Sequence, residues 1–267
     1  MNLRAAYAHR FQTANFAFAP PLKAGSHHPG PWMSFPLGGG GDILAELVVP
    51  DALAETQGER QLIAMTIVTL LRLWCDPDIE VAFESLVATA ELAAKGKSGD
   101  LRVIQSRSRP VRFAVDRSDS LHFSSSSASW VADHWSAAVR LRMRSPEFSL
   151  LLDTFETAQI MPSKAMMLVS MWGALEAVFT AEKSELRFRV SCNVAAYLEE
   201  AGDERAALQK KVLKLYDARS AAAHGSNKFS DEALLATVDL YRRVLFRIIE
   251  SGSLPDKGFL ERRLFGG

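Results

Sequence analysis

The chain has 267 residues, of which 48% are hydrophobic and 23% are charged, and its formal net charge is zero. This balance is typical of a protein that builds a hydrophobic core, and the length allows one large domain or two of ordinary size. The neutral charge argues against a broad basic surface, so an RNA or DNA partner would have to be bound by a local patch. We expect the two cysteines, Cys75 and Cys192, to be buried thiols and not a disulfide or metal ligands.

The sequence predicts neither a secretory signal nor a membrane anchor. Residues 1–11 lack the long apolar core of a signal peptide. The most apolar segment, 165–181, is interrupted by Glu176 and is shorter than the roughly 20 residues of a membrane-spanning helix. We therefore expect a cytoplasmic protein with no membrane partner.

The first half of the chain predicts an α+β region. Residues 1–41 are rich in Pro, Gly, His and aromatic residues and lead into LGGGGD, so we expect an irregular arm and linker there. Residues 42–125 predict an α+β domain with a strand at DILAELVV and a buried helix at 59–74. Residues 83–95 could form another helix. Short strand-like runs are expected at 78–83, 101–106, 110–115 and 120–124.

The second half predicts one helix after another, which makes the fold mainly α. Two connecting helices are expected within 126–161, and residues 162–267 are expected to hold a helical bundle. Its four helices have good N-terminal residues or C-terminal glycines, and short connections favour an antiparallel four-helix arrangement. The predicted bundle helices begin near Ser163, Ser184, Asp203 and Ser230, and three of them end at Gly202, Gly225 and Gly252.

Arg219 and Glu176 are expected to form an ion pair inside this bundle. The apolar stripe of the helix that starts at Asp203 runs from Leu208 to Tyr216, and the next position on the same line is Arg219. A charge on that face is costly unless it is paired. Glu176 is the only charged residue between positions 165 and 181, in line with other residues that face neighbouring helices.

An Arg followed five positions later by a His occurs three times, at Arg4, Arg117 and Arg219. Only the third match, LYDARSAAAHG, ends a helix of the predicted bundle. A straight helix places Arg219 and His224 about 140° apart around its axis. They could share a substrate only if the helix loosens near residues 222–224, or if two copies meet across a symmetric dimer.

These residues resemble a HEPN domain, in particular the Apea-like HEPN group, over about residues 160–252. The resemblance is carried by WGALEAVF with its Glu176, by ELRFRV in the second bundle helix, and by LYDARSAAAHG. The last has the R-S-x-x-x-H-G form of the family's Arg-x(4–6)-His signature. Residues 1–125 carry no such resemblance, and their role as a sensor or as a site for a regulatory protein or ligand is speculation.

The resemblance implies a homodimeric, metal-independent endoribonuclease that needs no cofactor and acts as a toxin or in antiviral defence. Arg219 would bind the scissile phosphate and His224 would act as general acid and base, which suits a guanidinium and an imidazole. Ser220, Glu176 and Tyr216 would support that pair. The alternative is a catalytically inactive dimerisation or binding module, in which Arg219 and Glu176 are a structural ion pair.

Five arginines on the second and fourth bundle helices could contact the RNA backbone, although such residues also form ordinary solvated faces. These are Arg187, Arg189, Arg242, Arg243 and Arg247. Other motifs fail as sites. KGKS at 95–98 has Glu91 where a phosphate-binding loop needs its first glycine, and His27–His28 have no second pair of ligands at metal spacing.

Overall fold

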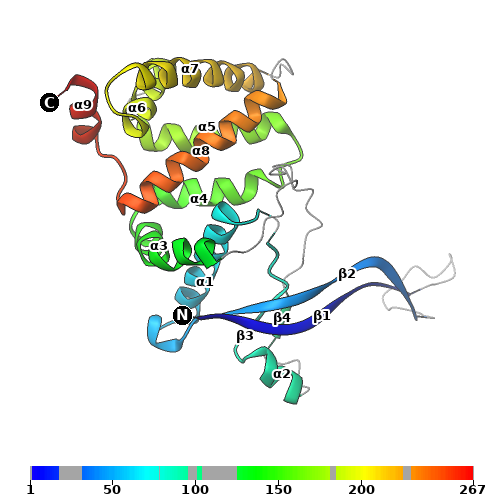
Figure 1. The fold of residues 1–267 in the computed structure, drawn as a ribbon. Helices are drawn as coiled ribbons and strands as arrows, with labels where there is room; N and C mark the ends of the chain where they lie inside the picture. The colour runs from blue at the N-terminus through cyan, green and yellow to red at the C-terminus, as the bar shows by residue number, and fades with distance from the viewer. Residues whose placement is uncertain are drawn as a thin grey trace. The chain divides into compact units, whose positions relative to one another are not determined.

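The structure is a computed structural model that describes residues 2–17, 32–77, 79–95, 101–103, 125–180, 185–224 and 230–266. The chain forms two compact units that are interleaved in sequence (Figure 1). The strand unit comprises Met1–Arg60 and Glu80–Arg107. The helical unit comprises Gln61–Ile79 and Ser108–Gly267. The expectation of a mainly helical protein with strands near its N-terminus is confirmed.

The strand unit is built on a long antiparallel hairpin. Strand β1 (Asn2–Ala17) pairs with β2 (Trp32–Val48), from Asn2 opposite Val48 to Ala17 opposite Trp32. A second antiparallel pair joins β3 (Phe83–Ser85) and β4 (Leu101–Val103). A 3-10 turn at Asp51–Leu53 and helix α2 (Thr89–Lys95) complete the described part of this unit.

The irregular arm expected at residues 1–41 is wrong where the structure describes it. The backbone of β1 and β2 forms ladder hydrogen bonds that need no particular side chain, so glycines 38–41 lie within a strand. Cross-strand polar contacts add to the pairing, because Arg4 contacts Glu46 at 2.6 Å and His9 contacts Asp42 at 2.7 Å. The sequence lacks the alternation of apolar and polar residues by which a strand is usually predicted.

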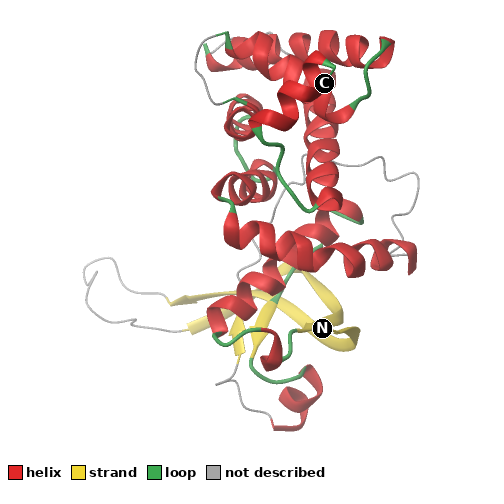
Figure 2. Ribbon diagram, turned by 90° about the vertical axis from the view of Figure 1, so that its left-hand side faces the viewer, coloured by secondary structure: helices red, strands yellow, loops and turns green. Residues whose placement is uncertain are grey.

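The helical unit contains helices that follow one another through the second half of the chain (Figure 2). Helix α1 begins in the strand unit and continues into this unit. The helices of this unit are α1 (Gln57–Trp74), α3 (Ser125–Arg144), α4 (Pro146–Ala158), α5 (Lys164–Phe179), α6 (Leu186–Leu198), α7 (Asp203–Ala223), α8 (Asp231–Ser251) and α9 (Lys257–Phe265).

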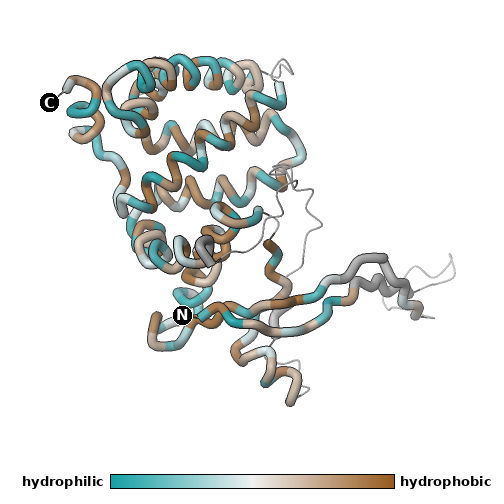
Figure 3. Tube along the Cα trace, in the orientation of Figure 1, coloured by the Kyte–Doolittle hydropathy of each residue, from teal (hydrophilic) through white to brown (hydrophobic). Residues whose placement is uncertain are grey.

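Helix α5 lies at the centre of the core and contacts α4, α6, α7 and α8. Its buried residues face in several directions, among them Met167, Trp172 and Phe179, because other helices surround it. By contrast, hydrophobic and hydrophilic residues alternate along α8 (Figure 3), as expected of a helix with one solvated face. Burying these apolar side chains stabilises the fold by about 25 cal/mol for each Å² of apolar surface removed from water.

The predicted helix ends agree with the structure at most described positions, but the end predicted at Gly202 is wrong, because α6 ends at Leu198 and Gly202 precedes α7. The Ser230 hydroxyl accepts a hydrogen bond from the Ala233 N–H and caps α8, while Gly252 ends that helix with a φ of 66°. Helix α7 begins at Asp203 as predicted. Helix α6 begins at Leu186 after Glu185, whose φ is 53°. The N-cap expected at Ser184 lies outside the described residues.

The predictions for residues 42–125 are confirmed in part. The buried helix at 59–74 is α1, and the strand at 42–49 is the second half of β2. The run at 101–106 contains β4, whereas 78–83 contributes only its last residue to β3. Residues 83–95 form a strand and then a short helix. The runs at 110–115 and 120–124 lie outside the described residues. Both cysteines are free, with Cys75 buried and Cys192 partly exposed.

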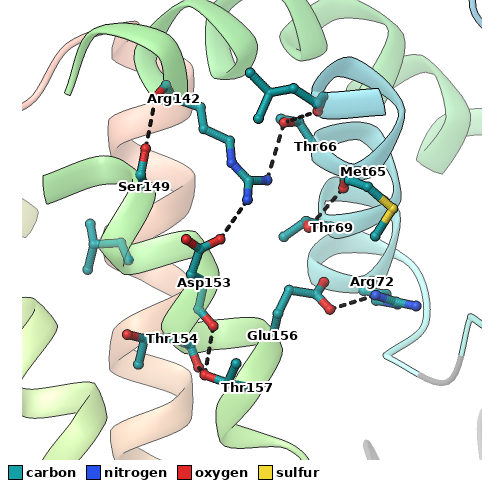
Figure 4. Close-up of polar contacts among 12 residues, drawn as sticks. Met65, Thr66, Thr69, Arg72, Arg142, Ser149, Asp153, Thr154, Glu156 and Thr157 are labelled. Atoms are coloured by element: carbon teal, nitrogen blue, oxygen red, sulfur yellow. Dashed lines mark hydrogen bonds and ion pairs between the residues drawn. The ribbon is translucent and has the colours of Figure 1, made fainter. Parts of the chain in front are cut away.

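A polar seam joins α1 to α3 and α4 inside the helical unit (Figure 4). Arg72 of α1 is only 7% exposed, donates to the Ile79 carbonyl, and pairs with Glu156 of α4 at 2.5 Å. Arg142 of α3 lies between the two other helices. It donates to the Thr66 hydroxyl and to the Asp153 carboxylate, the latter at 2.6 Å. These charges fix the register of α1 against α4.

The position of α1 differs from the expected domain boundary at residue 125. Because its apolar side chains and Arg72 pack within the helical unit, residues 61–79 belong to that unit and not to the N-terminal domain. Likewise α4 packs directly on α5 and is more than a connection. Across the described ranges, every helix is too short or too polar to cross a bilayer.

Replacing Glu156 with Gln should lower the free energy of unfolding by about 3 kcal/mol, because it leaves Arg72 buried without its counter-charge. Asp153→Asn, one turn earlier on α4, is the matched control. Its carboxylate is 58% exposed, so its loss should cost less than about 1 kcal/mol. Urea unfolding of both variants measures the difference. Equal losses would show that Arg72 does not depend on Glu156.

Candidate functional site

The candidate site begins with one carboxylate on the central helix. Glu176 of α5 lies one turn after Trp172, which is fully buried, so the two share a face of the helix. The Glu176 side chain is 17% exposed. A carboxylate in this position needs partners, because desolvation disfavours an unpaired charge.

Two residues of α7 supply these partners, and both reach the same oxygen. The Tyr216 hydroxyl donates to Glu176 Oε1 at 2.8 Å. Arg219 Nη2 lies 3.2 Å from that oxygen, which confirms the predicted ion pair. The guanidinium carbon lies 5.4 Å from the centroid of the Tyr216 ring, a distance at which the cation and the ring attract each other.

Tyr216 is held firmly in this cluster. It is 5% exposed, and Trp172 meets its ring edge to face with the centroids 5.2 Å apart. Burial raises the pKa of the Tyr216 phenol to about 12, and the hydrogen bond to Glu176 adds to the rise. The hydroxyl therefore keeps its proton at neutral pH and remains a donor to the carboxylate.

The cluster retains N–H donors that Glu176 does not use. Trp172 Nε1 and Arg219 Nε are both buried without a hydrogen-bond partner in the described part of the chain. The Arg219 side chain is nevertheless 24% exposed. The guanidinium thus has one nitrogen on the carboxylate and remains accessible from solvent, so it can accept an anionic group.

His224 lies at the C-terminal end of α7 with its side chain exposed. The backbone N–H of His224 donates to the Ser220 carbonyl at 3.2 Å, so the helical hydrogen bonding continues to this C-cap residue. The helix does not loosen before residue 224. In a regular helix Arg219 and His224 lie about 140° apart around the axis and about 7.5 Å apart along it. One copy of α7 therefore presents the guanidinium and the imidazole on different faces.

Three of the five other arginines named from the sequence are engaged by groups of their own. Arg187 pairs with Asp217 at 2.7 Å, and Arg243 pairs with Glu199 at 2.5 Å. Arg242 donates to the Leu73 carbonyl at 2.6 Å. Arg189 and Arg247 have exposed side chains on α6 and α8.

The other Arg-x4-His matches do not form a comparable site. Arg4 and His9 lie on β1, where each contacts a carboxylate of β2. Arg117 and His122 lie outside the described residues, as do His27 and His28. Within the described ranges, His, Cys, Asp and Glu side chains do not gather in threes that could hold a metal ion.

The hydrogen bond from Tyr216 to Glu176 was not predicted from the sequence. Its signal was the spacing of three between Tyr216 and Arg219, which places both side chains on one face of α7. A polar aromatic tip beside a buried-side arginine indicates a shared acceptor on the facing helix.

A double-mutant cycle should measure a coupling of about 1–3 kcal/mol between Glu176 and Arg219, using Glu176→Gln and Arg219→Met. The pair is mostly shielded from water, which strengthens the interaction. The matched control is the cycle for Arg187 and Asp217, which also involves α7 but is more than half exposed on both sides. That control should give less than about 1 kcal/mol. Equal couplings would contradict a special role for the buried pair.

Comparison with known proteins adds no relative to this description. A scan against models of known families, a search of curated proteins and a search of solved structures each found no match to the chain. The interpretation of the site therefore rests on its own geometry and on the sequence features that led to it.

Proposed function

We propose that the chain is a metal-independent endoribonuclease of the HEPN type, acting as a homodimer. The observation that carries the proposal is Arg219, a guanidinium fixed by Glu176 and the Tyr216 ring whose side chain is still partly exposed. Such a group is pre-organised to bind a phosphate and to stabilise the charge that develops on it. The exposed imidazole of His224, in the same motif, supplies a group that can accept and donate a proton.

In the proposed reaction, an imidazole takes the proton of a ribose 2′-hydroxyl as the 2′ oxygen attacks the neighbouring phosphorus. The bond from phosphorus to the 5′ oxygen breaks, and that oxygen receives a proton from an imidazolium. Arg219 holds the phosphate oxygens throughout. The products are a 2′,3′-cyclic phosphate and a fragment with a 5′-hydroxyl.

The regular geometry of α7 leads to the dimer. Because Arg219 and His224 of one copy lie on different faces, the proposed site combines the guanidinium of one copy with the imidazole of another. Ser220 lies between them on the helix and is partly exposed, so it is positioned to contact either the substrate or the second copy. A toxin or defence role would follow from RNA cleavage that is released under particular conditions.

Wild-type protein should cleave RNA in excess EDTA, and Arg219→Ala or His224→Ala should each slow cleavage by about 100-fold or more. Gel electrophoresis follows the cleavage, and mass spectrometry identifies the cyclic phosphate. Arg4→Ala and His9→Ala, which disrupt a match of the same spacing on β1, are the matched controls and should leave the rate unchanged. Equal cleavage by every variant would indicate a contaminating nuclease.

Mixing the two inactive variants tests the shared site. If each site combines Arg219 of one copy with His224 of the other, a mixed dimer of Arg219→Ala and His224→Ala has one intact site. Random pairing then restores about a quarter of the wild-type activity. A site within one copy would instead leave the mixture inactive.

The second candidate is a non-catalytic dimerisation or binding module. It is favoured by the pairing of Arg219 with Glu176, which serves the packing of α5 on α7 even if no substrate binds. Wild-type protein that forms dimers but leaves RNA intact under all conditions would support this module over the nuclease.

A further inference from the structure

A group of stacked aromatic rings lies in the helical unit, away from the motif on α7. Trp74, the last residue of α1, stacks on Trp130 of α3 with the centroids 4.5 Å apart and the planes only 6° from parallel. Phe246 of α8 meets both indoles edge to face, at 4.9 Å from Trp74 and 5.4 Å from Trp130.

These distances show that Phe246 does not cover the face of Trp74 that points away from Trp130. A ring lying over that face would be about twice as far from Trp130 as from Trp74. Phe246 is nearly equidistant from the two, so it flanks the pair. Trp74 is 37% exposed, whereas Leu70 and Leu73 of the same helical turn are fully buried. An indole that is covered on one face and exposed in this way presents a flat apolar surface to solvent.

The inner ring of the pair is fixed in place. Trp130 Nε1 donates to Glu250 of α8 at 3.3 Å. His134, one turn further along α3, stacks on Trp130 at 4.7 Å and donates from Nδ1 to the Trp130 carbonyl at 2.7 Å. Trp74 therefore rests on a support whose orientation is set by two other helical positions.

A cation lies beside this surface. Arg242 donates to the Leu73 carbonyl, next to Trp74, and its guanidinium lies 5.7 Å from the centroid of Phe246. The Asp239 carboxylate, three residues earlier on α8, interacts electrostatically with Arg242, and Arg242 Nε is buried without a hydrogen-bond partner in the described residues. An aromatic face next to an arginine is the combination that binds single-stranded nucleic acid, because the ring stacks with a base and the cation attracts a phosphate.

We propose that Trp74 is a stacking platform for an unpaired base of RNA and that Arg242 contacts the adjoining phosphate. This inference rests on the proposed function in one respect, namely that RNA is the ligand. It adds that the RNA is single-stranded where it meets the end of α1, and that this contact is separate from Arg219 and His224.

The test measures binding without cleavage, in His224→Ala protein with EDTA present. A fluorescently labelled oligoadenylate is titrated with this protein and with versions that also carry Trp74→Ala, Trp74→Phe or Arg242→Gln. We expect Trp74→Ala to weaken binding about 5- to 100-fold and Trp74→Phe, which keeps a ring, to restore most of it. Arg242→Gln should lower the slope of log affinity against log salt by about one.

Two controls complete the experiment. Phe265→Ala removes an aromatic ring of α9 that is 83% exposed, and it should leave the affinity unchanged. An RNA duplex of the same length should bind more weakly than the single strand. The single strand should also quench the protein's own tryptophan fluorescence, whereas the duplex should not. Equal affinity of Trp74→Ala and its parent, or quenching by a proline-rich peptide but not by RNA, would overturn the proposal.

The outcomes separate this inference from the nuclease proposal. Binding that depends on Trp74 in a protein that never cleaves RNA would support the platform and contradict the nuclease. If cleavage depends on Arg219 and RNA binding is unchanged by Trp74→Ala, the nuclease is supported and the stacking platform is contradicted.

Discussion

The burial of α5 is the constraint on which the rest of the helical unit depends. A helix that contacts four others is largely buried, and beyond Lys164 in its first turn its only charged residue is Glu176. That carboxylate has to be neutralised where it lies, and this requirement determines which face α7 turns inward. Tyr216 and Arg219 satisfy this requirement by contacting the same oxygen of Glu176. The packing of the core and the placement of the candidate phosphate-binding group therefore have the same origin.

The helical half could be predicted closely from the sequence because its signals are local. Caps at Ser230 and Gly252, and the stripe that leads to Arg219, depend on residues within a few turns of one another. The N-terminal hairpin could not be predicted in the same way. Its pairing joins residues up to 46 positions apart, Asn2 with Val48, and one of its strands is rich in glycine. Backbone hydrogen bonds between distant segments leave little trace in composition.

The candidate site was predictable in part for a related reason. The pairing of Glu176 with Arg219 follows from helical periodicity and the cost of a buried charge, so it could be inferred before any coordinates. The aromatic group of Trp74, Trp130 and Phe246 could not, because its members come from three helices whose arrangement no local pattern specifies. Both features belong to the helical unit. Under the two proposals, one would bind a phosphate and the other would stack on a base, which are neighbouring parts of one RNA strand.

The interleaving of the two units affects how the molecule can be dissected. The chain passes between them after Arg60, after Ile79 and again after Arg107. Removing everything before the run of helices in the second half would delete the whole of α1, including Arg72 and Trp74. The remaining fragment would leave Glu156 of α4 without its cation and Trp130 of α3 without its stacking partner, so no single cut yields an intact helical half. Transfer of that half into another protein during evolution would meet the same obstacle, so the two units would have to be inherited together.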